Sequence, residues 1–184
     1  PILAAIGGLT GHAHRGTMSP ADVSTRVVAD HIRATSFLIA DGVVPSTEWR
    51  GYVLRKIMRR AMRHGKHLGV GQPFLHQLVE VLDREMGDAY PELRANRPMI
   101  EKTILAEEHR FDAVLTEGLP RLEAEIEKAL AGPDRVVPGD AAFRLYDTFG
   151  IPFDFIEDTA ASSGATIDRA GYETAMATQR DKAR

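Results

Sequence analysis

Cysteine is absent from the 184 residues, which excludes disulfides, thiolate metal sites and a cysteine nucleophile. No apolar run approaches the ~20 residues that a membrane-spanning helix needs. The sequence also lacks a glycine-rich phosphate loop followed by Lys and Ser or Thr, a dinucleotide fingerprint and a nucleophile-elbow serine. Residues 1–16 lack the basic start and unbroken apolar stretch of a secretion signal. We therefore expect a cytoplasmic protein without a catalytic constellation of its own.

What is present is typical of a globular chain. Hydrophobic residues make up 43% of the sequence and charged residues 27%, which is not the composition of a disordered or fibrous protein. The length suits one domain or two small ones. The chain begins at Pro1, and its last residues continue a helical pattern without a stop signal. We expect a piece of a longer protein.

Acidic residues are missing from one stretch of the chain. Residues 50–66 contain no Asp or Glu but seven basic residues: Arg50, Arg55, Lys56, Arg59, Arg60, Arg63 and Lys66. Because the net charge of the whole chain is −3, the rest carries a marked excess of acid. The plain alternative is a solvated Arg-rich face, but these charges repel one another unless acids elsewhere in the fold approach them. The segregation predicts an anionic partner that presents phosphates.

Capping residues and apolar spacing predict a mainly α fold, a helical bundle with a long bent helix and a small two-stranded β element. Ser19, Pro20 and Asp22 form a helix start, and Gly42 ends that helix. Further helices are expected over residues 47–67, from 72 to about 87, over about 100–130 with a bend at Gly118 and Pro120, over 141–148 after an Asp140 cap, up to about 162, and after an Asp168 cap. Pro91 and Pro98 should bracket an irregular link, and residues 136–137 could pair with residues 165–167.

The apolar stripes of the first two long helices predict which faces are buried. The expected core positions are Val23, Val27, Ile32, Phe37 and Leu38 in the first, and Leu54, Ile57, Met58, Ala61, Gly65 and Leu68 in the second. The basic residues of 47–67 should then lie on its other side. There, Arg55, Arg59 and Arg63 form one row, and Lys56 and Arg60 form the adjacent row.

Two polar clusters receive plainer interpretations. His64 and His67 could present two nitrogens to a metal, but the surrounding Arg and Lys would repel a cation, so surface or phosphate-facing histidines are favoured. Glu107 and Glu108 lie in the long helical pattern, where an acidic pair is typical of a solvated face. Neither cluster predicts an active site.

Four strings of the sequence carry a resemblance to a known family. They are Arg26-Val-Val-Ala-Asp-His-Ile-Arg33, Phe37-Leu-Ile-Ala-Asp-Gly-Val43, Arg50-Gly-Tyr-Val-Leu-Arg55 with Arg59-Arg60 and Arg63-His-Gly65, and Ala142-Phe-Arg-Leu-Tyr-Asp-Thr-Phe-Gly150. They closely resemble alanyl-tRNA synthetase, a class II aminoacyl-tRNA synthetase, and the resemblance runs from about residue 1 to residue 184. It matches the helical tRNA-recognition region that follows the catalytic domain.

The resemblance implies a domain organisation. Residues 1–18 correspond to the tail of the catalytic domain and a linker, residues 19–132 to the helical tRNA-recognition domain, and residues 133–184 to a small α+β segment packed on it. The full-length family uses ATP with magnesium in the catalytic domain and zinc in the editing domain, and no cofactor is expected in this chain. The implied partners are the tRNA for alanine and the other domains of the same polypeptide. The fragment alone is expected to be inactive as an alanine–tRNA ligase.

The family recognises a wobble G·U pair in the acceptor stem, where the guanine amino group is left unpaired in the minor groove. A carboxylate suits that amino group because it only accepts hydrogen bonds. Asp147 matches the family's carboxylate; the plain alternative is a helix-end Asp bonded to local backbone. The family's second discriminator is an Asn, and Thr47 stands at that position here. A Thr hydroxyl is shorter than an amide, so Thr47 would act through a water or leave recognition to Asp147.

The basic residues are the implied phosphate contacts of the resemblance: Arg50, Arg55, Lys56, Arg59, Arg60 and Arg63. Arg50 and Arg55 could instead pair with acids within the fold. Trp49 could stack on a ribose or base, or pack against the preceding turn. Two other functions stay open: a stand-alone helical nucleic-acid-binding module, and a scaffold whose basic helix docks on an acidic protein.

Overall fold

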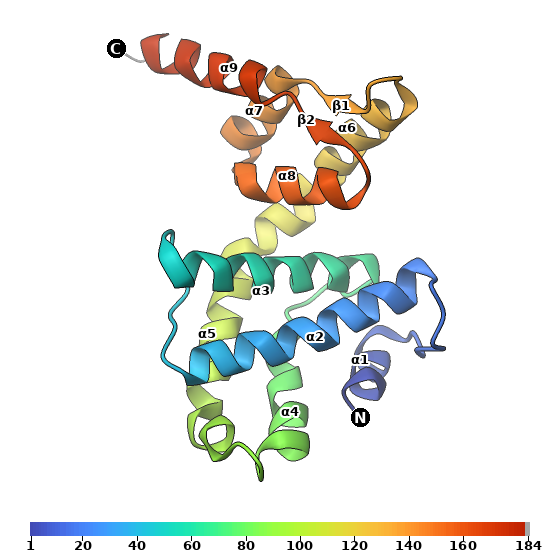
Figure 1. The fold of residues 1–184 in the computed structure, drawn as a ribbon, viewed down its shortest axis with the longest axis vertical. Helices are drawn as coiled ribbons and strands as arrows, with labels where there is room; N and C mark the ends of the chain where they lie inside the picture. Colours follow the sequence, from blue (N-terminus) through green and yellow to red (C-terminus); the bar gives the residue numbers. More distant parts are fainter. Residues whose placement is uncertain (183–184) are drawn as a thin grey trace. The chain divides into compact units, whose positions relative to one another are not determined.

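The computed structural model describes residues 1–182, which fold as two compact units, Pro1–Asp112 and the residues from Ala113 onward. Both units are built mainly of helices, as the sequence predicts (Figure 1). Within the described part of the chain, no helix combines the length and the apolar character that crossing a membrane requires.

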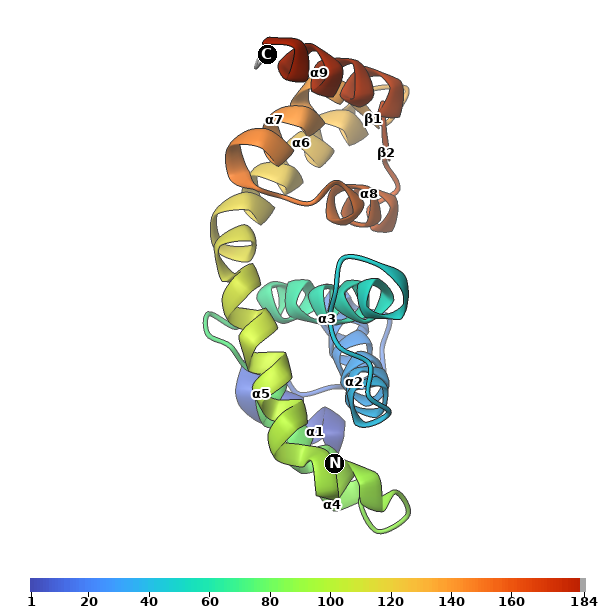
Figure 2. The ribbon, with the colours of Figure 1, turned by 90° about the vertical axis from the view of Figure 1, so that its left-hand side faces the viewer.

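The first unit is entirely helical. Its elements are α1 (Ile2–Thr10), α2 (Pro20–Ala40), α3 (Trp49–His67), the 3₁₀ turn η1 (Leu75–Gln77), α4 (Leu78–Met86) and α5, which runs from Pro91 to Ala113 at the unit boundary. Helices α2 and α3 lie side by side, and α5 runs across them (Figures 1 and 2). Helix α1, which the apolar spacing did not predict, packs on α2 and α4 and buries Ile6 completely.

Helix α2 begins as predicted. The Ser19 hydroxyl accepts a hydrogen bond from the backbone N–H of Asp22 (3.2 Å), and Pro20 is the first helical residue. The predicted core face was only partly right: Ile32 is buried, but Val28 and Ile39 are the other buried aliphatic residues. The buried side of α2 also carries small polar residues, and their small size allows α3 to approach closely. These are Ser24, Thr25, Thr35 and Ser36.

Helix α3 begins two residues later than the predicted Thr47 because the chain first folds over its own first turn. A Cβ atom placed on Gly51 would lie 2.2 Å from the Ser46 hydroxyl and from the Val44 carbonyl, so only glycine permits this approach. The predicted core stripe is confirmed at Leu54, Met58, Ala61, Gly65 and Leu68, whereas Ile57 is half-buried.

The predicted irregular link between Pro91 and Pro98 is wrong. Both prolines belong to α5, with Pro91 as its first residue and Pro98 inside it. Because Pro98 is exposed, water can bind the Arg94 carbonyl that loses its N–H partner there. The bend predicted near Gly118 and Pro120 corresponds to a π-helical turn, η2 (Val114–Gly118), between α5 and α6 (Leu119–Ala131).

The second unit adds short elements to α6. These are β1 (Val136–Val137), α7 (Gly139–Phe149), α8 (Phe153–Ser162), β2 (Thr166–Ile167) and α9 (Arg169–Lys182). The predicted strand pairing is confirmed and is parallel, with Val136 opposite Thr166. The Asp168 cap is also confirmed, since its carboxylate accepts from the Gly171 N–H at 3.0 Å. The Asp140 cap is wrong: Pro138 precedes α7, and Asp140 lies in its first turn.

Candidate nucleic-acid interface

The loop before α3 and the first residues of α3 present an exposed polar and aromatic surface. Thr47, Trp49 and Arg50 are all exposed, and Trp49 is 88% exposed. The Ser46 hydroxyl donates to the Glu48 carbonyl (2.7 Å), which closes the loop above the first turn of the helix. The alternative in which Trp49 packs against the preceding turn is therefore wrong.

One row of the basic helix faces protein and not solvent. The Nε atoms of Arg55 and Arg59 both donate to one oxygen of Glu107, at 3.1 and 3.2 Å. The Glu107 side chain is 1% exposed, and the two arginine side chains are 22% and 11% exposed. The Arg59 guanidinium also lies over the Phe111 ring, 4.5 Å from its centroid. The alternative in which Arg55 pairs with an acid of the fold is confirmed, whereas the plain alternative of a solvated Arg-rich face does not hold for these two arginines.

The remaining basic residues of α3 differ in exposure. Arg63 is 3% exposed and so lies inside the structure. Lys56 is half-buried, with its ammonium 5.8 Å from the centroid of the Tyr52 ring. Arg50 and Arg60 are exposed, and no ion pair joins either to another residue within 1–182. The cationic charge that solvent reaches most readily thus comes from Arg50, Arg60 and part of Lys56.

The interpretation of Glu107 and Glu108 as a solvated pair is wrong. Glu108 is 4% exposed and accepts hydrogen bonds from the N–H groups of Phe74 and Leu75, both at 2.7 Å. Its other oxygen accepts from the His76 N–H (3.3 Å) and lies 2.7 Å from His76 Nδ1. Glu108 therefore caps η1 from a distant helix. For Glu107 the charge of α3 was the available signal, since its arginines need an acid nearby, whereas the cap made by Glu108 had no local signal in the sequence.

His64 is half-buried, and its contacts are made within the fold. Its Nδ1 lies 2.9 Å from the Ser24 hydroxyl, and its ring meets His67 edge-on at 5.6 Å. Burial, together with the positive charges of Arg63, His67 and Arg60, lowers the pKa of His64 to about 3. Within residues 1–182, no group of three or more His, Asp or Glu is placed to hold a metal ion.

This histidine makes stability depend on pH. In the unfolded chain His64 titrates near its ordinary value of 6.5, but in the folded chain only near 3. Between these values the unfolded state binds a proton that the folded state does not, so the free energy of unfolding should fall as the pH falls below 6.5. Urea unfolding of wild type and His64→Asn at pH 7, 5.5 and 4.5 measures this. The variant should lose less stability over that range, and equal pH slopes would contradict the assignment.

The range from pH 7 to 4.5 lies above the pH at which Asp22 affects the free energy of unfolding. Hydrogen bonds from the Thr17 hydroxyl, His12 and backbone N–H groups hold the pKa of the buried Asp22 carboxyl far below its usual value of 3.8. Its stabilising contribution is therefore complete above pH 3.8 and is lost only as the pH falls below it. The change between pH 7 and 4.5 consequently does not come from Asp22.

Asp147 lies in the second unit, near the end of α7. Its carboxylate is exposed, and no hydrogen bond or ion pair joins it to another residue within 1–182. The alternative role of bonding local backbone is therefore not observed. Gly150, in the left-handed conformation, ends α7 with hydrogen bonds to the carbonyls of Leu145 and Tyr146. The helix is held by Tyr172 of α9, which stands edge-on to Tyr146 at 6.0 Å.

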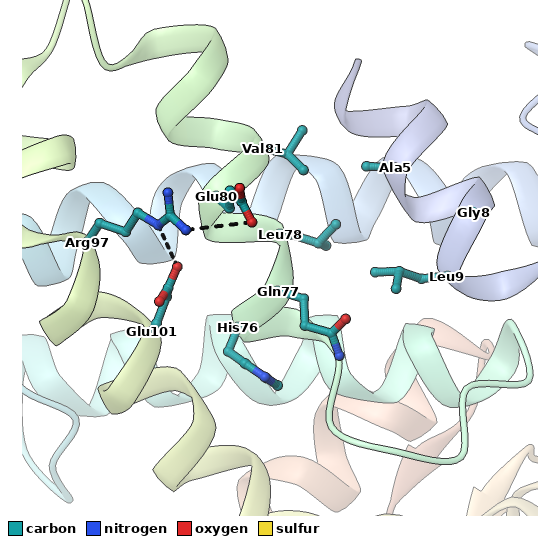
Figure 3. A pocket seen from close by; sticks show the side chains of 10 residues that line it. All are labelled: Ala5, Gly8, Leu9, His76, Gln77, Leu78, Glu80, Val81, Arg97 and Glu101. Carbon is teal, nitrogen blue, oxygen red and sulfur yellow. Dashed lines mark hydrogen bonds and ion pairs between the residues drawn. The ribbon is translucent and has the colours of Figure 1, made fainter.

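A surface pocket of about 530 Å³ lies between α1 and the α4–α5 side of the first unit (Figure 3). Ala5, Leu9, Leu78 and Val81 form its apolar part. Arg97, its cation, contacts the carboxylates of Glu101 at 2.7 Å and Glu80 at 3.6 Å. Because these acids neutralise the guanidinium, the pocket has little attraction for an anion. The cationic end of α3 is the better candidate.

Comparison with known protein families assigns the chain to one of them. The model of the family described as tRNA synthetases class II (A) matches residues 1–184, and the chain belongs to that family. Among individual proteins, it is similar to the alanine–tRNA ligase of Gluconobacter oxydans, with 51% identity over 171 residues that cover 93% of the chain and 19% of the relative. The alanine–tRNA ligase of Geobacillus kaustophilus is 46% identical over 184 residues, 100% of the chain and 21% of the relative. The chain thus spans about a fifth of the length of these relatives.

Proposed function

We propose that this segment recognises the acceptor stem of the tRNA for alanine within an alanine–tRNA ligase, and so supports the attachment of alanine to that tRNA. The cationic charge of α3, with no acid among residues 50–66, carries the proposal. The similarity to alanine–tRNA ligases over nearly the whole chain supports the choice of tRNA. In this proposal ATP, magnesium and zinc stay with the catalytic and editing domains outside the segment.

The basic residues of α3 have different roles in this proposal. Arg50 and Arg60 are exposed and bind phosphates directly, and Lys56 contributes the accessible part of its side chain. Arg55 and Arg59 are anchored through Nε to Glu107, so they supply positive potential and fix the orientation of the helix face. Arg63, being buried, contributes field and not contact.

Asp147 is proposed to read the G·U pair, with Thr47 as a second contact. An exposed carboxylate without an internal partner can accept a hydrogen bond from the free amino group of guanine. Thr47 is exposed beside the start of α3, and its hydroxyl can donate one hydrogen bond and accept others. These contacts give base-pair preference, whereas the phosphate contacts give affinity that falls with salt.

The test compares two RNA hairpins that copy the acceptor stem and differ only in G·U or G·C at the recognised pair. Wild type should prefer G·U by about 1–3 kcal/mol at fixed low salt. Asp147→Ala should remove the preference but still bind both hairpins. Arg60→Ala should weaken both equally and reduce the slope of log affinity against log salt by about 1. Fluorescence anisotropy of the labelled hairpins measures the affinity of all three proteins.

Asp140→Ala is the matched control for Asp147, because Asp140 is also exposed on α7. It should leave the preference intact. Equal losses on both hairpins for Asp147→Ala would contradict base-pair recognition by this residue. Equal affinity for duplex DNA would favour a general nucleic-acid-binding module, and no RNA binding at low salt would favour docking of α3 on an acidic protein.

A further inference from the structure

Trp49 is the least covered large hydrophobic side chain among the residues described. It is 88% exposed and is the only tryptophan of the chain. Such a ring leaves a large apolar surface in water, so folding of this unit gains little from it. Core packing therefore does not account for a tryptophan here, and a ring that does not serve the interior is available to a ligand.

The backbone at Trp49 adds a second observation. Its backbone φ angle is 54°, in the left-handed region that residues other than Gly, Asn and Asp rarely adopt. The surrounding turn imposes this conformation, because the Ser46 hydroxyl bonds the Glu48 carbonyl and the turn packs on Gly51. A bulky residue held in an unfavourable conformation by its neighbours is typical of a ligand-contacting position.

The surroundings of the ring point to the ligand. Arg50 is the next residue and is exposed, and the rest of α3 supplies further cations. Val53, 52% exposed and four residues on, extends the apolar surface on the same side of the helix. An aromatic ring at the end of a cationic surface combines phosphate attraction with a stacking face, the combination that binds single-stranded nucleic acid. The carboxylates of an acidic protein would match the charge but offer no aromatic face to the ring.

We propose that the Trp49 indole stacks on an unpaired nucleobase of RNA held by α3. The inference rests on the proposed function, since it needs RNA at this helix, but it adds a contact that neither phosphate binding nor G·U reading requires. Bases in the interior of a duplex have no free face, whereas the bases of a single-stranded extension do. Trp49 thus makes binding depend on nucleotides beyond the base-paired stem.

The experiment titrates the chain with an acceptor-stem hairpin carrying a single-stranded 3′ extension, and with the same hairpin cut flush. RNA anisotropy measures binding, and fluorescence of the only tryptophan measures stacking independently. With the extension, wild type should bind and its fluorescence should be quenched. Trp49→Gly should bind the extended hairpin roughly 5- to 150-fold more weakly. It should bind the flush hairpin as wild type does.

Four controls make the result specific. The salt dependence of binding should be the same for Trp49→Gly and wild type, because no charge is removed. Trp49→Phe should retain part of the affinity, and Val53→Ala should retain nearly all of it. Thermal unfolding should show that Trp49→Gly is at least as stable as wild type, because glycine accepts the left-handed conformation freely.

The outcomes separate the two proposals. Binding by anisotropy without quenching, or an equal affinity loss on both hairpins for Trp49→Gly, overturns stacking and leaves the proposed function standing. An equal loss for Val53→Ala overturns stacking in favour of a general apolar contact. No binding of either hairpin overturns both proposals together.

Discussion

Replacing Glu108 with Ala should lower the free energy of unfolding by about 3–5 kcal/mol, the cost of breaking a buried charged cluster by removing one partner. The carboxylate is 4% exposed and accepts from three consecutive backbone N–H groups, those of Phe74, Leu75 and His76. These donors belong to the start of η1 and have no helical carbonyl to bind. Without Glu108 the two shortest bonds, at 2.7 Å, are lost and their donors stay buried. Urea unfolding measures the change.

Two variants test whether the loss comes from the cap itself. Glu108→Gln keeps one accepting oxygen for Phe74 and Leu75 but turns an amide toward His76, so an intermediate loss is expected. Glu85→Ala removes an exposed acid from the neighbouring α4 and should change the free energy of unfolding by less than about 0.5 kcal/mol. A loss below about 1 kcal/mol for Glu108→Ala would show that water or another group satisfies the η1 donors.

Glu107→Ala should have the second large effect, a loss of about 3 kcal/mol or more. One Glu107 oxygen accepts from both Arg55 and Arg59, and Arg110 lies 3.8 Å from the other. Removal of the acid leaves two largely covered guanidinium groups that repel each other across one turn of α3. Urea unfolding again supplies the measurement.

A double-mutant cycle measures the interaction between Glu107 and Arg59. The losses for Glu107→Ala and Arg59→Ala should not add, with a coupling energy of about 1–3 kcal/mol, because each variant already removes the shared contact. Glu107→Gln retains an accepting oxygen and should lose less than Glu107→Ala. Strictly additive losses would mean that the acid and the arginine stabilise the unit separately.

Patterns local in the sequence predicted much of the fold. The Ser19 and Asp168 caps and the Gly42 and Gly150 ends all depend on residues near one another. The pairing of Val136 with Thr166 joins residues 30 positions apart, and there the β-branched residues of the two short segments were the signal. The prediction failed where local rules have exceptions. Pro98 was taken as a helix breaker, yet its exposed position lets the helix continue, and Asp140 was taken as a cap although Pro138 precedes the helix.

The candidate site was predicted less completely than the fold. The sequence identified α3 as the cationic element and suggested that Arg55 pairs with an acid, but it could not name Glu107, which is 52 residues away. The contrast between exposed Arg60 and buried Arg63 likewise depends on which side of α3 its neighbours cover. The left-handed backbone of Trp49 had no signal in the sequence, since tryptophan gives no hint of that conformation.

The sequence by itself determined the helical class, most of the helices from α2 onward and the concentration of positive charge in one helix, because propensity, capping and charge are properties of neighbouring residues. Only the tertiary structure decided which of those charges reach solvent. It placed Glu107 beneath Arg55 and Arg59, put Glu108 at the start of η1 and left Trp49 uncovered. The physical reason is that burial and ion pairing join residues far apart in the chain, and their partners are set by how helices pack.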